Sequence, residues 1–347
     1  MAQATPLAIS LHQLSALRGA CYTKRMMRPM TRLAQKAVGF LFVIIAAGLS
    51  GTAQTQSPSP TPTATPPASD IFVVEVGTKR NRETKDLEPN FTEPKKITDY
   101  TGYNNQPFFL PDGHRILYTS IRNGQADIYS YDLKSGQTTQ VTNTPESEYS
   151  PTLMPDGKNI SVVRVEKDGT QRLWKFPVAG GGAPSLILEN VKPVGYHHWI
   201  DDHTLALFIL GSTGKPNTLQ IADTRTGKSE IVAENPGRIL RKVPDRNQFS
   251  FVHKISDQHW EIKYFDMRSH TIASLIETLP GVEDYAWLNG ALLMGKDAKL
   301  FAVRPFTGGK WTEVGDFSKA GIKRITRIAV SGNRIAIVAV QVSEARP

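Results

Sequence analysis

The sequence has very little cysteine, since Cys21 is the single one among 347 residues. A disulfide framework within the chain and a cysteine-based zinc site are therefore excluded. Motifs of nucleophilic and nucleotide chemistry are also missing. The chain has no G-x-S-x-G nucleophile elbow, no P-loop and no G-x-G-x-x-G loop. Nucleophilic catalysis from such an elbow has little support in this sequence.

Acidic residues are absent from the first 53 positions. This segment carries six cations, which are Arg18, Lys24, Arg25, Arg28, Arg32 and Lys36. An uncharged apolar run follows at 37–49, and then the small residues of 50–53. A basic region, a short apolar region and small residues at the cut are typical of a secretory signal peptide, which we expect to be cleaved after Ala53. Residues 1–53 thus predict export to the periplasm or beyond.

A retained membrane anchor is the alternative interpretation of the run at 37–49. Thirteen strongly apolar residues are short of the roughly 20 that span a bilayer. If the run is retained, the chain is membrane-anchored and faces outside the cytoplasm. Met26, Met27 and Met30 are alternative starts, and any of them would remove Cys21. No cysteine stands at the expected cut, which argues against a lipoprotein anchor.

The basic charge of the chain is concentrated in this export segment. Without its six cations the formal net charge falls from +9 to +3. We therefore expect no nucleic-acid partner. Residues 54–69 are rich in Pro, Ser and Thr, as in an extended linker that packs no core.

A repeat of about 44 residues organises the remainder, 70–347. The turn Pro111-Asp112-Gly113 recurs as Pro155-Asp156-Gly157. Weaker copies follow around Asp202, Asp245, Asn289 and Ser331. Each turn suits a tight hairpin, and runs of alternating β-formers such as 115–120 and 127–131 follow it. Four short strands per 44 residues predict an all-β fold, a six-bladed β-propeller.

The ring is expected to close by sharing one blade between the two ends of the repeat region. Residues 326–340 supply two strands of the sixth blade, while 71–76 and 95–98 supply the other two. Closure of this kind removes the open edges of the ring. The polar segment 78–94 between the two N-terminal strands is interpreted as a loop. The length of the chain is thus explained by one domain at 70–347.

The Pro-Asp-Gly turns, the aliphatic strands after them and the Asp-x-x-(Ser/Thr)-Gly turns at 132–136 and 223–227 resemble the WD40-like repeats of the TolB family. The resemblance covers most of 97–345. It implies a six-bladed propeller exported to the periplasm. In that family the propeller belongs to the Tol–Pal envelope machinery and binds a lipoprotein and translocating toxins. The chain departs from the family in having no segment that reads as an N-terminal α/β domain.

Ligands of propellers usually sit where loops enter the innermost strands. The corresponding side chains here are polar, aromatic and mixed in charge, which suits a protein or peptide better than a polyanion. We therefore predict a non-enzymatic protein that binds a protein or peptide, such as an envelope protein, and needs no cofactor. The predicted binding residues are Tyr103, Glu148, Tyr149, Tyr196, His197, His198, Arg241, Lys242, Asp284, Tyr285 and Arg327.

Two other classes of function stay open. One is a channel-sited enzyme, such as a metal-assisted lyase or hydrolase acting on a glycan, with the His-rich segment 196–203 as its metal ligands. Alternation along a strand sends His197 and His198 to opposite faces, so no metal site is expected there. The other class is a membrane-tethered sensor or scaffold, which requires that the run at 37–49 is retained.

Overall fold

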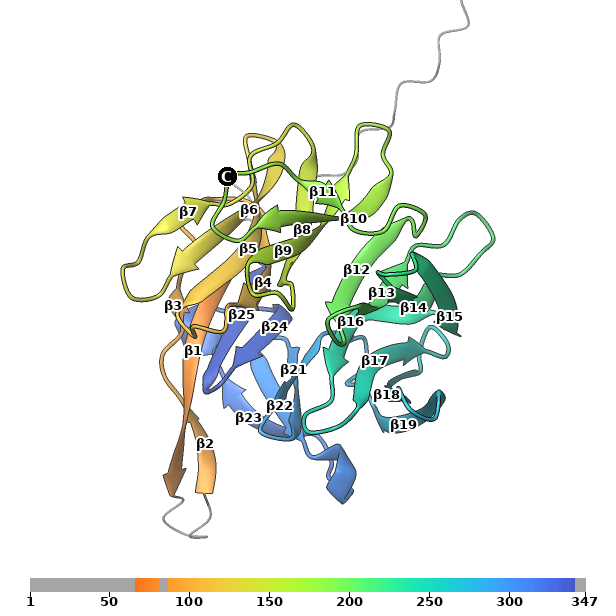
Figure 1. Ribbon diagram of the computed structural model, residues 1–347. Coiled ribbons are helices and arrows are strands. Elements are labelled where there is room, and N and C mark those ends of the chain that lie inside the picture. Colours follow the sequence, from red (N-terminus) through yellow and green to blue (C-terminus); the bar gives the residue numbers. More distant parts are fainter. Residues whose placement is uncertain (1–65, 81–86, 341–347) are drawn as a thin grey trace, which may run out of the picture. The chain divides into compact units, whose positions relative to one another are not determined.

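Six antiparallel sheets form the blades of a propeller around a central channel (Figure 1). The computed structural model describes residues 66–80 and 87–340. The predicted signal peptide and residues 54–65 of the predicted linker lie outside these residues. Two short 3-10 segments, η1 (Pro305–Thr307) and η2 (Ser318–Ala320), are the only helical elements in the described part of the chain, and no helix there is long and apolar enough to cross a membrane. The all-β, six-bladed fold is confirmed.

Five blades have four strands that follow one another in sequence, each with its first strand innermost. Blade 1 consists of β4 (Asn104–Phe109), β5 (Arg115–Arg122), β6 (Gln125–Asp132) and β7 (Thr138–Gln140). Blade 2 consists of β8 (Ser147–Leu153), β9 (Asn159–Val165), β10 (Gln171–Pro177) and β11 (Ser185–Leu186). Blade 3 consists of β12 (Val194–Trp199), β13 (Thr204–Ile209), β14 (Thr218–Asp223) and β15 (Lys228–Glu234). Blade 4 consists of β16 (Pro236–Lys242), β17 (Gln248–Lys254), β18 (Trp260–Asp266) and β19 (Thr271–Glu277). Blade 5 consists of β20 (Tyr285–Leu288), β21 (Ala291–Lys296), β22 (Lys299–Val303) and β23 (Thr312–Asp316).

The sixth blade combines strands from both ends of the repeat region, as predicted. It consists of β24 (Ile325–Ser331), β25 (Arg334–Val340), β1 (Ser69–Arg80) and β3 (Lys95–Lys96), with β2 (Leu87–Phe91) beside β1. Strand β1 pairs with β25 from Ser69 opposite Val340 to Glu75 opposite Arg334. The innermost strand β24 contacts β4 of blade 1, so the ring is closed.

The segment 78–94, interpreted as a loop, instead contains strand residues in both of its described parts, and these pair with each other. Strand β1 continues to Arg80 and pairs with β2, with Val76 opposite Phe91. Figure 1 shows this hairpin extending away from the ring. Phe91 explains why the polar segment becomes ordered, because its ring packs edge-on against Phe317 after blade 5, with centroids 5.7 Å apart. Phe91, which is partly buried, thus anchors β2 to the apolar cluster around Phe317.

Apolar side chains gather between neighbouring blades and form the core there. Along β5, Ile116 and Tyr118 pack toward blade 6, whereas Leu117 packs toward blade 2. Both faces of such a strand are covered, so it reads as an unbroken apolar run. The innermost strands bury less apolar surface, so polar side chains can occupy them and face the channel.

The turn of blade 3 departs from the predicted alignment by one residue. Asp112, Asp156 and Asp201 each accept, with Oδ1, hydrogen bonds from the backbone N–H groups two and three residues later. The predicted alignment placed Asp202 in this role and was wrong. In blade 3 the backbone N–H of Ile200 donates to the carbonyl of Thr204, four residues later. In blade 1 the N–H of Leu110 donates to the carbonyl of Arg115, five residues later, so the turn of blade 3 is one residue shorter.

A pair of substitutions tests this assignment. Asp201→Ala removes a charged acceptor of two backbone N–H groups, and we expect it to lower the free energy of unfolding by about 1 kcal/mol. Asp202→Ala is the matched control and should change it by less than about 0.5 kcal/mol. Urea unfolding of both variants gives the comparison. A larger loss in Asp202→Ala would contradict the assignment.

Candidate functional site

One end of the channel opens into a cavity of about 510 Å³, which we call the mouth. It lies where the chain enters the innermost strands, and five of the six blades contribute to it. The side chains that line it are mostly aromatic or charged. Those used below are Tyr103, Tyr196, Arg238, Trp260, Glu283, Asp284, Arg324 and Arg327.

An ion-pair network crosses the mouth from blade 4 to blade 5. Arg238 Nη1 lies 3.0 Å from Glu283 Oε1, and Lys254 Nζ lies 2.7 Å from Glu283 Oε2. Burial opposes ionisation of Glu283, but the two cations outweigh it and lower its pKa. Arg238 also donates from Nη2 to the carbonyl of Thr326 at 3.0 Å. The network therefore fixes Arg238 and ties blade 4 to blade 6.

Asp284 lies behind this network and is almost fully buried. Its Oδ2 is 3.8 Å from the Nε atoms of both Arg238 and Arg327, which is too long for a hydrogen bond. Its Oδ1 accepts the backbone N–H of Ile328 at 2.8 Å. Burial raises the pKa of Asp284 although Arg327, Arg238 and Arg241 act against the rise. The carboxylate is thus shared loosely among several guanidinium groups.

Aromatic rings and cations meet around the same opening. The guanidinium of Arg327 lies 5.5 Å from the ring centroid of Tyr196, and Lys254 Nζ lies 4.4 Å from that of Trp260. Burial raises the pKa of Tyr103 to about 12, so this phenol stays protonated as a hydrogen-bond donor. Tyr, Trp and Arg are the residue types that dominate binding energy at protein interfaces.

The predicted binding residues occupy different parts of the propeller. Tyr103, Tyr196, Asp284 and Arg327 come together at the mouth. His198 and Arg241 lie with Tyr196 and Arg327 on a second cavity of about 280 Å³. The backbone N–H of exposed Lys242 donates to His198 Nε2 at 3.0 Å.

His197 and Tyr285 make contacts between blades through a shared serine. In β20, Tyr285 Oη and Trp287 Nε1 each donate to Ser250 Oγ of the preceding blade, both at 2.9 Å. The same arrangement occurs two blades earlier, where Ser161 Oγ lies 2.7 Å from Nε2 of His197 and 2.9 Å from Nε1 of Trp199. Burial lowers the pKa of His197 to about 3, so the imidazole is neutral. These side chains hold blades together.

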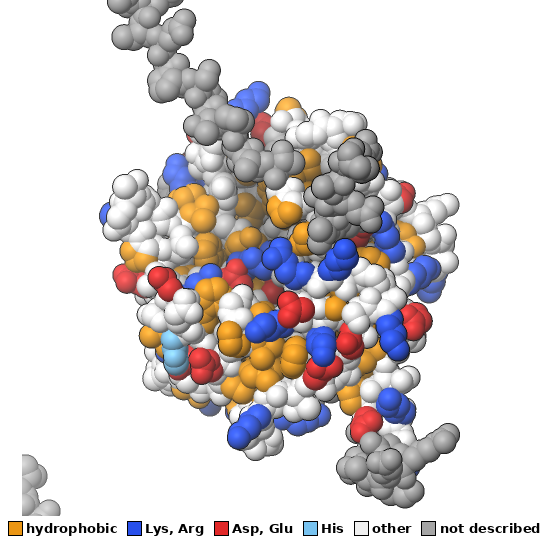
Figure 2. Space-filling model, turned by 180° about the vertical axis from the view of Figure 1, so that it is seen from behind, with side chains coloured by type: hydrophobic (Ala, Val, Ile, Leu, Met, Phe, Trp, Pro, Cys, Tyr) orange, Lys and Arg blue, Asp and Glu red, His pale blue; other side chains and the backbone are white. Residues whose placement is uncertain are grey.

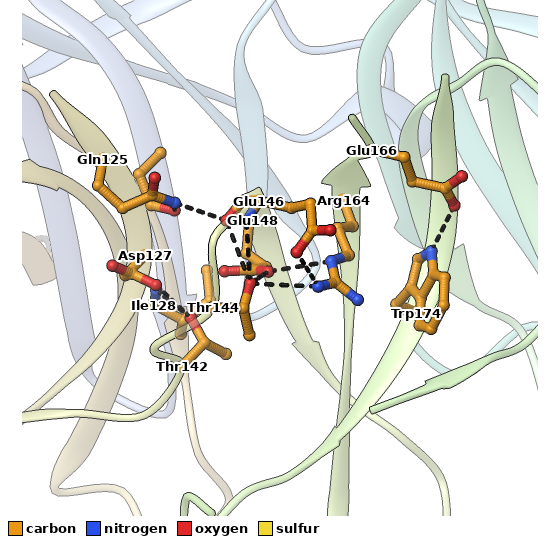
Figure 3. A network of polar contacts seen from close by, with 11 residues as sticks. Gln125, Asp127, Ile128, Thr142, Thr144, Glu146, Glu148, Arg164, Glu166 and Trp174 are labelled. Atoms are coloured by element: carbon orange, nitrogen blue, oxygen red, sulfur yellow. Dashed lines mark hydrogen bonds and ion pairs between the residues drawn. The ribbon is translucent and has the colours of Figure 1, made fainter. Parts of the chain in front are cut away.

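Glu148 lies in a polar network between blades 1 and 2 (Figure 3). Its side chain is fully buried, accepts a hydrogen bond from Thr144 and lies 3.3 Å from Arg164 Nε. Arg164 also pairs with Glu146. Burial, together with the nearby Asp127 carboxylate, raises the pKa of Glu148 to about 7. Tyr149, the next residue, packs against the apolar cluster between blades 2 and 3.

Three side chains bridge successive inner strands by accepting a backbone N–H from the residue 44 positions later. Gln106 accepts from Ser150, His198 from Lys242 and Asp284 from Ile328, at 2.9, 3.0 and 2.8 Å. Blades 1 and 2, 3 and 4, and 5 and 6 are joined in this way. Burial, with nearby Arg241, lowers the pKa of His198 to about 3, so the ring is neutral, and the contact with Lys242 requires the tautomer in which Nε2 is the acceptor.

Sequence reasoning missed Arg238, Lys254 and Trp260 as residues of the mouth and of the neighbouring ion-pair network. Arg238 precedes the turn proline of blade 4 by six residues, the same offset that separates Asn105 from the turn proline of blade 1. Counting six residues back from the turn proline of blade 4 would therefore have identified Arg238. Trp260 begins β18, the third strand of its blade, and no local pattern indicates that it reaches the mouth.

The described residues contain no group of three or more His, Cys, Asp or Glu side chains arranged to hold a metal ion. In the segment 196–203, His197 contacts Ser161 of blade 2, whereas His198 contacts Lys242 of blade 4. The two histidines thus lie on opposite faces of β12, as strand alternation requires.

Comparisons with known proteins agree with this architecture. Residues 64–192 match the family model of the TolB beta propeller domain. The Tol-Pal system protein TolB of Francisella tularensis subsp. tularensis is 33% identical over 78 residues, which are 19% of this chain and 18% of that protein. The match thus spans less than a fifth of that relative's length.

Two solved structures share the fold at low sequence identity. The putative TolB from Agrobacterium tumefaciens superposes with a TM-score of 0.61 at 14% identity, covering 80% of this chain and 99% of that one. An oligogalacturonate lyase in complex with manganese gives a TM-score of 0.50 at 13% identity, covering 74% and 83%. The chain is a TolB-like six-bladed β-propeller, and its match to the TolB propeller model lies in residues 64–192.

Proposed function

We propose that this protein is an exported, non-enzymatic propeller that binds a protein or peptide through the mouth of its channel. The composition of the mouth carries the proposal, because Tyr103, Tyr196, Trp260 and Arg327 surround an open cavity next to an ordered ion-pair network. Rigid aromatic and arginine side chains at the centre of a concave surface are typical of interface hot spots. Export is proposed from residues 1–53, which lie outside the described residues.

The charge of the surface supports the same kind of partner. Figure 2 shows one face on which basic and acidic side chains are interspersed instead of gathering into a patch of one sign. Around the mouth, Arg238, Arg324 and Arg327 stand beside Glu283 and Asp284. A mixed pattern suits the varied groups of a polypeptide, whereas a polyanion requires a continuous basic surface. The fold itself does not decide the function, since it also carries a lyase.

Affinity capture with matched variants of the full chain tests the proposal. Trp260→Ala removes an aromatic wall of the mouth, and we expect about 30-fold weaker retention of a partner from envelope extracts. Arg324→Glu reverses an exposed charge at the rim and should weaken retention at least about tenfold.

The control is Arg268→Glu, which reverses an exposed arginine on the turn between β18 and β19. It should bind the partner as the wild type does. The proposal fails if all three variants retain the same proteins as the wild type, because the mouth would then contribute nothing to binding.

A further inference from the structure

The second cavity, of about 280 Å³, lies along the channel beside the mouth, and we call it the inner cavity. Arg238, Arg241 and Arg327 all line it, and no Asp or Glu does. Its volume is several times the roughly 30 Å³ that a water molecule occupies in the liquid. Three cations around a partly enclosed space without an acidic side chain are unusual, because an uncompensated charge is costly away from bulk water.

Nearby carboxylates compensate these arginines unevenly. Arg238 has a close partner in Glu283 at 3.0 Å. The carboxylate that Arg327 approaches among the residues with described positions is Asp284, at 3.8 Å. Within the described residues, Arg241 has no carboxylate within 4.0 Å, and its Nη1 donates to the carbonyl of Leu240 at 3.3 Å.

The local charge balance is therefore positive. In the described ranges, Arg238, Arg241, Arg327 and Lys254 face only two carboxylates, Glu283 and Asp284, and Lys254 already shares Glu283. Burial lowers the pKa of Arg241 while Asp284 acts against this, as expected for a guanidinium whose compensation is incomplete. His198 is neutral and adds no charge.

Two buried hydrogen-bond donors on the same cavity also lack partners. Ser150 Oγ is buried and has no hydrogen-bond partner in the described part of the chain, and the same holds for Arg238 Nε. Buried polar groups usually pair, so those without a partner need an explanation. A hydroxyl and guanidinium N–H groups that line one cavity can all donate to the same acceptor.

From these contacts we infer that the inner cavity is an anion site that binds a carboxylate group. Arginine forks match a carboxylate in shape and charge, and the pairing is stronger away from bulk water. Building on the proposed function, the carboxylate comes from an acidic side chain or the C-terminus of the peptide that enters through the mouth. The positive excess and the free donors would then be satisfied only in the complex.

Thermal unfolding of the full chain with sodium acetate tests the site without any partner. Sodium chloride at equal ionic strength is the reference. We expect acetate to raise the Tm of the wild type saturably, by at least about 3 °C. Arg241→Gln should lose at least half of this rise. Arg225→Gln, at an exposed arginine paired with Asp223 on the turn after β14, should keep all of it.

The outcomes separate this inference from the proposed function. An equal effect of acetate and chloride, or an undiminished rise in Arg241→Gln, overturns the anion site, and so does a rise with phosphate but not with acetate. If Arg241→Gln does not fold, Arg241→Lys keeps the charge without the fork and should show a reduced rise. A normal acetate response together with unchanged capture by both Trp260→Ala and Arg324→Glu would overturn the proposed function and leave the anion site standing.

Discussion

Glu148→Gln is expected to make the protein more stable than the wild type at pH 8 and to leave the two similar at pH 5. The pKa of Glu148 is raised from 4.5 to about 7 in the folded state. A group with a raised folded pKa contributes stability at low pH and loses it as the pH rises through that pKa. Glutamine resembles the protonated acid in shape and cannot ionise, so the variant escapes this loss.

The size of the effect follows from the shift. The difference in unfolding free energy between variant and wild type should change by about 2 to 3 kcal/mol between pH 5 and pH 8. Urea unfolding at several pH values measures it. Comparing variant with wild type cancels the opposite trend expected from His197 and His198, whose lowered pKa values favour the folded state as the pH rises toward 6.5.

Glu166→Gln is the matched control, since Glu166 pairs with Arg172 in the same blade. The hydrogen bonds from Arg172 lower the pKa of Glu166, so its contribution to stability is lost only in acid, below the range tested. Its substitution should shift stability by the same amount at pH 5 and at pH 8. If Glu148→Gln behaves in that way too, Glu148 is ionised throughout and the interpretation is wrong.

Ser250→Ala should lower the free energy of unfolding by about 2 to 4 kcal/mol. Ser250 is fully buried, accepts from Tyr285 and Trp287 of the next blade, and donates to the carbonyl of Arg241. Its removal leaves a fully buried phenol and an indole N–H without their partner, and each such group costs about 1 to 3 kcal/mol. Denaturant unfolding measures the loss.

Two controls isolate the cause. Ser274→Ala removes a hydroxyl that bonds Glu261 on the outer strand β19, and it should cost less than about 0.5 kcal/mol. Tyr285→Phe removes the phenol, so Ser250→Ala should cost less in that background than in the wild type. Equal losses for Ser250→Ala and Ser274→Ala would show that the shared serine does not join the blades.

Much of the fold could be predicted because the repeat is a local signal. Each Pro-Asp-Gly turn and each aliphatic run is stabilised by contacts inside its own hairpin, as the hydrogen bonds of Asp112 and Asp156 show. The turn of blade 3 lacks the Pro-Asp-Gly sequence, and there the prediction chose Asp202 instead of Asp201. It also missed the hairpin formed by β1 and β2, because the partner against which Phe91 packs, Phe317, lies in a distant segment.

The candidate site was harder to predict from the sequence, because neighbouring positions on an inner strand have different surroundings. Glu148 and Tyr149 fall in one predicted segment, yet Glu148 is enclosed with Arg164 and Tyr149 packs against apolar residues of the next blade. Arg238 and Glu283 meet across two blades although 45 residues separate them. No pattern within either segment indicates that contact.

The sequence by itself determined the all-β class, the number of blades and the closure of the ring. Turn chemistry and strand alternation act over a few residues and recur with the repeat, so they can be read along the chain. Only the tertiary structure decided which inner side chains hold the blades together and which face open space. That choice depends on the packing of adjacent blades, which makes His197 a partner of Ser161 and leaves Arg241 in the inner cavity without a carboxylate within 4.0 Å among the described residues.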